Sequence, residues 1–233
     1  MTMSYRRKMD NCGVVIPDSF YPVDSLRQYV HLGTVKNYAK NSSVIIPGEP
    51  TNALIIVLEG RIRINLISDD GREVLLYFAG KNCLLGRLFP TEDNIHAVAI
   101  ENSTICRFTK DNLKEIFRDN EEMPFDILKN YLAKASYFMR QVAEINSYNP
   151  TIRILRLIYR LCVLHGKQLE NAHEIVIKLS QANIAEITGA HYVTVSRVLN
   201  CLKKEKILNK NKDKIIVYDL EKLKLLSEQS TYY

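Results

Sequence analysis

The sequence contains no apolar segment long enough to cross a bilayer. Its longest apolar run, Ala53–Leu58, has six residues, whereas a transmembrane helix needs about 20. Residues 1–13 carry charge, but no apolar core follows them, so they do not have the form of a signal peptide. We therefore expect a cytoplasmic protein with no membrane partner.

Metal-binding patterns are also missing. The five cysteines form no CxxC pair, so we expect neither a structural zinc nor an iron–sulfur cluster, and we can assign no haem ligands. A jelly-roll enzyme of the cupin type needs two or three histidines close together. The N-terminal half offers only His31 and His96, far apart in the sequence. Such an enzyme is the less favoured alternative, and we expect no catalytic residues, no metal and no cofactor.

The first half of the chain has the pattern of an all-β domain. Turn signals such as Asp70-Gly71 separate short apolar runs, a spacing typical of a sandwich, barrel or jelly roll. We assign residues 1–110 to a β-roll. The expected strands are Val44–Ile46, Leu54–Leu58, Ile62–Ile67, Val74–Phe78, His96–Ile100 and Thr104–Phe108.

Residues 111–147 are predicted to form a dimerisation helix. Pro124 suits the first turn of a helix. After it, apolar residues recur at intervals of 4, 3, 4 and 3, the repeat of a two-stranded coiled coil. The alternative is a helix that packs only on its own domain. Asn149-Pro150 breaks the helix and is the expected hinge to a third segment, residues 148–233. The apolar stripe consists of Leu128, Leu132, Ala135, Met139 and Val142.

Residues 180–207 have the spacing of a helix-turn-helix. Ile184, Val195 and Val198 occupy positions that lock the two helices, Ala185 is small where they cross, and Gly189 tolerates positive φ in the turn. Two short β-branched runs after the second helix, around a Lys-rich turn, indicate a wing. The spacing alone also fits a helical hairpin that binds no nucleic acid.

Charge favours DNA binding over that alternative. Residues 190–224 hold nine Lys or Arg and four acids, a net charge of +5 out of +6 for the whole chain. Such a local basic excess is what phosphate binding requires. The predicted DNA-binding residues are His191, Tyr192, Val193, Thr194, Ser196, Arg197, Lys203 and Lys212.

A β-roll, a long dimer helix and a C-terminal winged helix, in that order, resemble the CRP/FNR family of transcription regulators. The resemblance covers nearly the whole chain. Its most specific motifs are IPGE and LEGRIRI in the strands, LLGRLFP in a loop and TVSRVL in the second helix of the helix-turn-helix. It implies an α+β fold, a homodimer that binds a DNA palindrome, activation by a small effector, and contact with RNA polymerase.

The resemblance also restricts the class of small molecule that we expect as the effector. Cyclic-AMP receptors hold the ribose with a Glu and the phosphate with an Arg-Ser pair; here the matching positions are Arg87, His96 and Ala97, so a cyclic nucleotide is a poor candidate. Residues 14–22, 140–157 and 191–208 resemble the halorespiratory branch of the family. That branch implies an ortho-chlorinated phenol as effector and control of reductive dehalogenation genes. Another small anionic effector is the alternative.

The residues of the expected effector site suit this chemistry. Tyr131 and Lys134, at i and i+3, share a face of the long helix, and Tyr77 lies near the end of a strand. A cation with phenol hydroxyls would hold a phenolate or carboxylate. Without the resemblance, ordinary packing and a surface lysine would be the simpler interpretation. The predicted effector-binding residues are Tyr77, Gly86, Arg87, Asn94, Tyr131 and Lys134.

The second helix of the helix-turn-helix also predicts which DNA bases are contacted. Arg197 should contact guanine, whereas Val193, where many oxygen-sensing relatives have Glu, can contact only a thymine methyl. The half-sites should therefore resemble TTAAT.

Cys201 lies among Lys and Arg residues, which lower a thiol pKa. We predict a Cys12–Cys201 disulfide that silences DNA binding; the alternative is two inert thiols. Cys83, Cys106 and Cys162 should be buried and unreactive.

Overall fold

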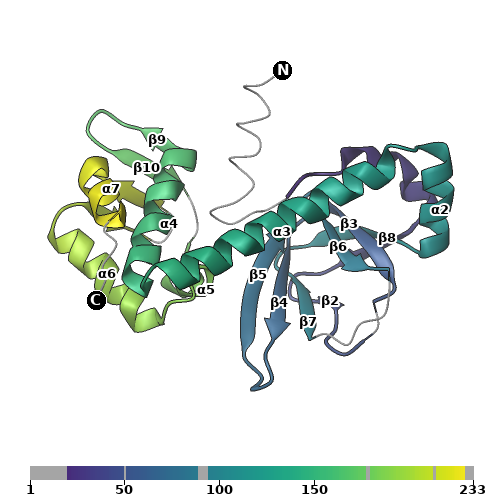
Figure 1. The fold of residues 1–233 in the computed structure, drawn as a ribbon, viewed down its shortest axis with the longest axis horizontal. Coiled ribbons are helices and arrows are strands. Elements are labelled where there is room, and N and C mark those ends of the chain that lie inside the picture. The colour runs from purple at the N-terminus through teal and green to yellow at the C-terminus, as the bar shows by residue number, and fades with distance from the viewer. Residues whose placement is uncertain (1–19, 50, 89–93, 177–178, 212–213, 229–233) are drawn as a thin grey trace. The chain divides into compact units, whose positions relative to one another are not determined.

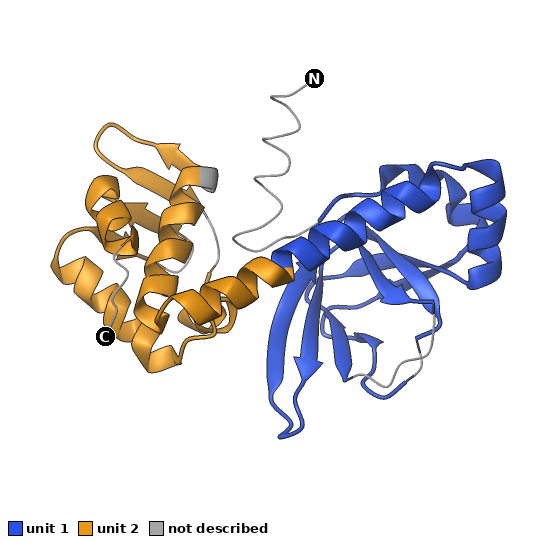
Figure 2. Cartoon of the chain, viewed as in Figure 1, with its two compact units in different colours: residues 1–137 blue, residues 138–233 orange. Residues whose placement is uncertain are grey.

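The protein divides into two compact units, which Figure 2 colours separately: residues 1–137 and residues 138–233. The structure is a computed structural model that describes residues 20–49, 51–88, 94–176, 179–211 and 214–228. The boundary between the units falls inside a long helix, α3. None of the helices in these ranges is long and apolar enough to span a membrane.

Two four-stranded antiparallel sheets form the β-roll of the first unit (Figure 1). Their strand orders are β1-β8-β3-β6 and β2-β7-β4-β5. Six of the eight strands match predicted runs; β1 and β6 do not. β1 is an edge strand with four exposed residues of five, so it has no apolar alternation to detect. The strands are β1 (Thr34–Tyr38), β2 (Ser43–Ile45), β3 (Ala53–Glu59), β4 (Ile62–Ile67), β5 (Glu73–Ala79), β6 (Leu84–Arg87), β7 (Ile95–Ala99) and β8 (Ser103–Phe108).

The core of the β-roll explains why β3 is apolar at nearly every position. Leu54, Ile56 and Leu58 belong to a buried cluster with Leu26 and Leu113, which come from the flanking helices. Because strand side chains alternate between faces, the intervening residues of β3 point the other way, and they too are fully buried. A strand that is buried on both faces has a continuous apolar sequence.

Three helices accompany the β-roll: the 3-10 helix η1 (Asp24–Leu32), α2 (Lys110–Asp119) and α3 (Met123–Ser147). The predicted helical segment 111–147 therefore comprises two helices. Thr109 caps α2, and Pro124 lies in the first turn of α3, as expected. The predicted apolar stripe of α3 is exposed: Leu128 53%, Leu132 56%, Met139 66% and Val142 58%, with Ala135 also exposed. Phe125 (55%) and Ile145 (52%) extend the exposed apolar face beyond the predicted stripe.

The second unit is a winged helix-turn-helix. Its sheet has the strand order β11-β12-β10-β9, so the predicted two-stranded wing is half of a four-stranded sheet. β9 and β10 were not predicted, because they are three and four residues long and contain few apolar residues. The elements are α4 (Pro150–His165), β9 (Gly166–Gln168), β10 (His173–Val176), α5 (Gln181–Thr188), α6 (Tyr192–Lys204), β11 (Leu208–Lys210), β12 (Lys214–Val217) and α7 (Leu220–Glu228).

Candidate functional site

A buried lysine inside an aromatic cage is the central feature of the first unit. Lys134 is 6% exposed. Its Nζ lies 4.8 Å from the ring centroid of Tyr131, 5.4 Å from that of Tyr77 and 5.9 Å from that of Phe20. It also donates a hydrogen bond to the Leu84 carbonyl at 2.5 Å. Lys134 is therefore not a surface lysine, and the structure brings it together with both predicted tyrosines.

Burial determines the protonation of this cluster, hereafter the Lys134 cage. Desolvation lowers the pKa of Lys134, while it raises the pKa of Tyr131 to about 12 and that of Tyr77 well above its ordinary value. The charge of Arg87 opposes the shift of both tyrosines, so this predicted residue acts electrostatically on the cage. At neutral pH both phenol hydroxyls keep their protons and can donate hydrogen bonds to an anion.

Gly86 has a steric role at the edge of the cage. Its φ is +86°, a conformation that L side chains rarely adopt, and a Cβ there would collide with the Ala53 carbonyl oxygen. Its own carbonyl accepts a hydrogen bond from the Tyr131 hydroxyl at 3.2 Å. Any other residue would displace β6 from β3 and with it the acceptor of Tyr131.

Sequence reasoning missed two residues of this site. Phe20, 1% exposed, packs edge-on against Tyr77 with ring centroids 5.2 Å apart and closes the cage. Asn130 is fully buried and its Nδ2 donates to the Tyr21 carbonyl at 2.6 Å, which fixes the segment that carries Phe20. Asn130 and Lys134, at i and i+4, share one face of α3, and that spacing was the available signal.

Among the contacts described, none joins the predicted effector residue Asn94, or His96, to the Lys134 cage. Asn94 is exposed, and its carbonyl accepts from the Ile67 amide at 2.7 Å. His96 bonds the Glu73 carboxylate through Nδ1 at 3.1 Å and the Ser43 hydroxyl through Nε2 at 3.0 Å. The Glu73 carboxylate, which is bonded to His96 at the position matched to the phosphate clamp, would repel a cyclic phosphate. This arrangement supports the expectation that a cyclic nucleotide is a poor effector.

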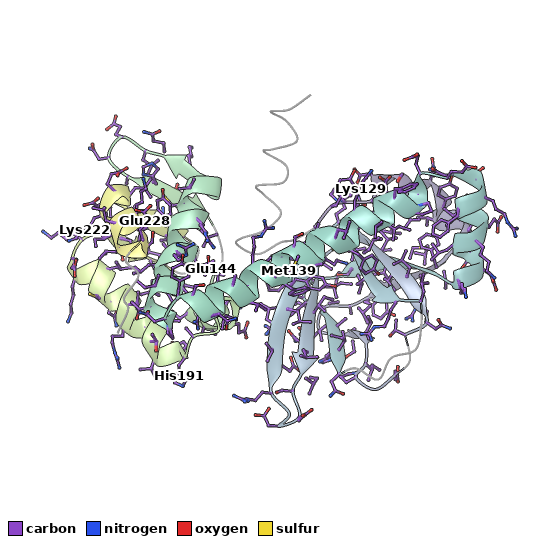
Figure 3. The ribbon with its side chains drawn as sticks, in the orientation of Figure 1. Lys129, Met139, Glu144, His191, Lys222 and Glu228 are labelled. Carbon is purple, nitrogen blue, oxygen red and sulfur yellow. The ribbon has the colours of Figure 1, made fainter. Side chains whose placement is uncertain are left out.

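The start of α6 forms an exposed surface suited to base reading. His191, labelled in Figure 3, caps the helix, as its Nδ1 accepts from the Val193 amide at 3.2 Å. Tyr192 is 53% exposed and Val193 51%. Arg197 is exposed one turn later, whereas Thr194 and Ser196 are half-buried. These are the positions that a recognition helix presents to the major groove.

The inward face of α6 holds that surface in place. Val195, Val198 and Ile184 are buried, which confirms the predicted apolar patch. Gly189 has φ +59° in the turn before α6, as the spacing predicted. The predicted positions therefore lock the two helices and leave the N-terminal turns of α6 exposed.

A polar hollow of about 290 Å³ lies beside α6. Lys203 was predicted to bind DNA; the other lining residues were not. Lys212 lies outside the described residues. The hollow is lined by Gln181 of α5, Leu199, Asn200 and Lys203 of α6, Lys210 of β11, and Asn211.

The expectation for the Cys201 thiol is wrong. Cys201 is exposed, but its pKa is raised, chiefly because its thiol donates a hydrogen bond to the Glu205 carboxylate at 3.5 Å. Lys204 and Lys222 act in the opposite direction without outweighing the acid. Cys12 lies outside the described residues. Cys83, Cys106 and Cys162 are buried, as predicted. No cluster of three His, Cys, Asp or Glu side chains suited to a metal occurs among the residues described.

Comparison with known proteins places this geometry in a family. Residues 35–120 match the cyclic nucleotide-binding domain, and residues 152–226 match the Crp-like helix-turn-helix domain. A solved structure of a CprK point variant complexed with OCPA is 53% identical, with a TM-score of 0.87, over 93% of this chain and 99% of its own. The chain belongs to the CRP/FNR family of transcription regulators.

Other members of the CRP/FNR family match at greater distance. The global nitrogen regulator of Nostoc sp. is 24% identical over 79% of this chain and 85% of its own length. A CooA mutant from Carboxydothermus hydrogenoformans, 20% identical with a TM-score of 0.78 over 91% of this chain and 98% of its own, has the same fold. The predicted α+β architecture is confirmed, and this chain is a ligand-responsive, DNA-binding CRP/FNR regulator.

Proposed function

We propose that this CRP/FNR regulator senses an ortho-chlorinated phenol, binds it as the phenolate in the Lys134 cage, and activates genes of reductive dehalogenation. The observation that carries the proposal is the buried cation among aromatic rings. A CprK structure at 53% identity and a TM-score of 0.55 is a complex with o-chlorophenolacetic acid, which supports the same effector class here.

The chemistry of the cage favours a phenolate over a neutral phenol. Lys134 donates to the Leu84 carbonyl, and an anion offers it a stronger, charge-assisted partner. The hydroxyls of Tyr77 and Tyr131 stay protonated and add donors. An ortho halogen lowers the pKa of the phenol, so the anion is available near neutral pH. The apolar ring of the effector meets the rings of Phe20 and Tyr77.

A second candidate is another small aromatic or aliphatic anion. The positive charge of Arg87, which acts on both cage tyrosines, favours it.

Thermal unfolding separates the candidates, because a ligand of the native state raises stability by mass action. We expect the melting temperature to rise with o-chlorophenolacetic acid, to rise much less with its unchlorinated counterpart, and to stay constant with cyclic AMP. A shift with cyclic AMP alone would reject the proposal.

A homodimer through α3 is part of the proposal. Six apolar side chains of α3, from Phe125 to Ile145, are more than half exposed in one chain, and a second copy would cover them as a coiled coil does. We expect sedimentation to give a dimer both free and on a palindrome whose half-site centres lie about 34–36 Å apart. Leu132→Glu should produce monomers, and Leu225→Glu on α7 is the control. A monomeric parent on DNA contradicts this interface.

We assign the hollow beside α6 to a DNA backbone phosphate. Lys203 is exposed at its rim. Because each neutralised phosphate releases counterions, Lys203→Met should weaken binding to all sequences alike and reduce the slope of log K against log salt by about 1. Lys110→Met, on α2, is the control. The assignment fails if the slope of the Lys203→Met variant equals that of the control.

Three further expectations extend the proposal beyond the structure. The regulator works in the cytoplasm, as the sequence predicts, and contacts RNA polymerase, as its family resemblance implies. The Cys12–Cys201 disulfide stays a prediction. Since the hydrogen bond to Glu205 raises the pKa of the Cys201 thiol, its thiolate fraction near neutral pH is small, and oxidation by this route should be slow.

A further inference from the structure

A single arginine binds the carbonyl ends of two helices in the second unit. Arg153, in the first turn of α4, donates through Nε to the Thr188 carbonyl at 2.7 Å and through Nη2 to the Gly189 carbonyl at 3.1 Å. Its Nη1 donates to the carbonyls of Tyr148 at 2.7 Å and Ile145 at 3.4 Å. One guanidinium therefore joins the end of α3 to the turn that precedes the recognition helix α6.

Arg153 stabilises the partial negative charge at the carbonyl ends of both helices. The last carbonyls of a helix lack intrahelical partners and carry partial negative charge. Neither α3 nor α5 has a basic residue in its own last turn. The planar guanidinium presents five donors in a fixed fork, which suits several carbonyls at once, whereas a lysine offers one compact ammonium.

A second contact holds the same end of α3. Arg156 of α4 bonds both oxygens of Glu144, with distances of 3.0–3.1 Å, and Arg160 bonds Oε1 as well. The Glu144 side chain is only 15% exposed. Arg156 also stacks over the Tyr148 ring, 4.1 Å from its centroid. Figure 3 labels Glu144, which lies on the part of α3 that belongs to the second unit.

These contacts span the break at Asn149-Pro150, where the sequence predicted a hinge. Asn149 caps α4 by accepting from the Ile152 amide at 3.0 Å, and Arg153 spans the break between α3 and α4. We propose that Arg153 is a positioning residue: it makes the last turn of α3, α4 and the helix-turn-helix one rigid body, so that movement of α3 orients α6. That the movement follows phenol binding rests on the proposed function.

Arg153→Lys tests the proposal, since it keeps the charge and removes the fork. The first measurement is amide hydrogen exchange in residues 145–149 and 188–191, because local opening appears as faster exchange. We expect both segments to exchange several-fold faster together. Arg118→Lys, an exposed residue of α2, is the control and should exchange like the parent. This measurement needs neither effector nor DNA.

The second measurement is the ratio of DNA dissociation constants without and with o-chlorophenolacetic acid. Allosteric couplings commonly reach about 5- to 150-fold, and we expect Arg153→Lys to bring the ratio to within about twofold of one. A merely structural loss would weaken both affinities and leave the ratio unchanged.

The outcomes separate this proposal from the proposed function. Unchanged exchange in Arg153→Lys overturns the rigid body, whatever the effector does. Faster exchange with an unchanged ratio overturns the role of Arg153 in signalling. If the parent itself does not respond to the phenol, the proposed function fails, while the exchange rates still decide whether Arg153 holds the two helix ends together.

Discussion

Replacing Lys134 with Met is expected to weaken binding of o-chlorophenolacetic acid by about 10- to 100-fold, because a charge-assisted hydrogen bond contributes roughly 1.5–3 kcal/mol. The pH profile should change as well. In the parent, affinity rises as the phenol ionises and falls again at higher pH, when Lys134 loses its proton. Burial lowers the pKa of Lys134, so this fall comes below the ordinary lysine pKa of about 10.4. The variant should show neither limb clearly.

Stability measurements distinguish loss of a ligand contact from misfolding. The folded state disfavours the charged form of Lys134, so the unfolded state binds more protons in that pH range, and stability rises as pH increases through it. Without effector, Lys134→Met should be at least as stable as the parent and should lack this rise. Lys129→Met, also on α3 but 43% exposed, is the matched control. Equal effector affinity in both variants removes Lys134 from the site.

Val193→Glu is expected to change the preferred half-site from TTAAT to TTGAT. Val193 is 51% exposed on the first turn of α6, where its methyl groups can meet a thymine methyl but accept no hydrogen bond. Glu at this position accepts from the cytosine N4 of a G·C pair, and such a contact discriminates by about 1–3 kcal/mol. Selection from a randomised half-site measures the change at the third position.

The neighbouring residue supplies the control for this substitution. Tyr192→Phe keeps the exposed ring beside Val193 and should leave the third position unchanged. Recovery of a strong G with the parent protein would show that Val193 does not read this base pair.

Periodic features were predictable from the sequence, and contacts distant in sequence were not. The helix-turn-helix depends on local spacing, so Ile184, Val195 and Gly189 could be assigned before the fold was known. Tyr131 and Lys134 share a helix face for the same reason. Their partner Phe20, however, comes from more than one hundred residues away, and no periodic pattern links it to them.

The local charge balance around Cys201 predicted the wrong direction for the pKa shift of its thiol. The residues around Cys201 are mostly basic, yet the acid one helical turn later accepts its hydrogen bond and raises the thiol pKa. This directed hydrogen bond outweighs the charges of Lys204 and Lys222. Arg153 was missed for a related reason, because its four acceptors are backbone carbonyls and backbone carbonyls leave no mark on a sequence.

The Glu144–Arg156–Arg160 cluster has a consequence for the design of chimeric sensors. A DNA-binding module cut at Pro150 would lose Glu144 and leave two half-buried arginines, 22% and 29% exposed, without their carboxylate. It would also leave Arg153 without the α3 carbonyls. A transplant that starts at Phe138 retains all of these partners. A foreign input domain should therefore be joined in helical register upstream of Phe138, so that the DNA-binding module retains the last turns of α3.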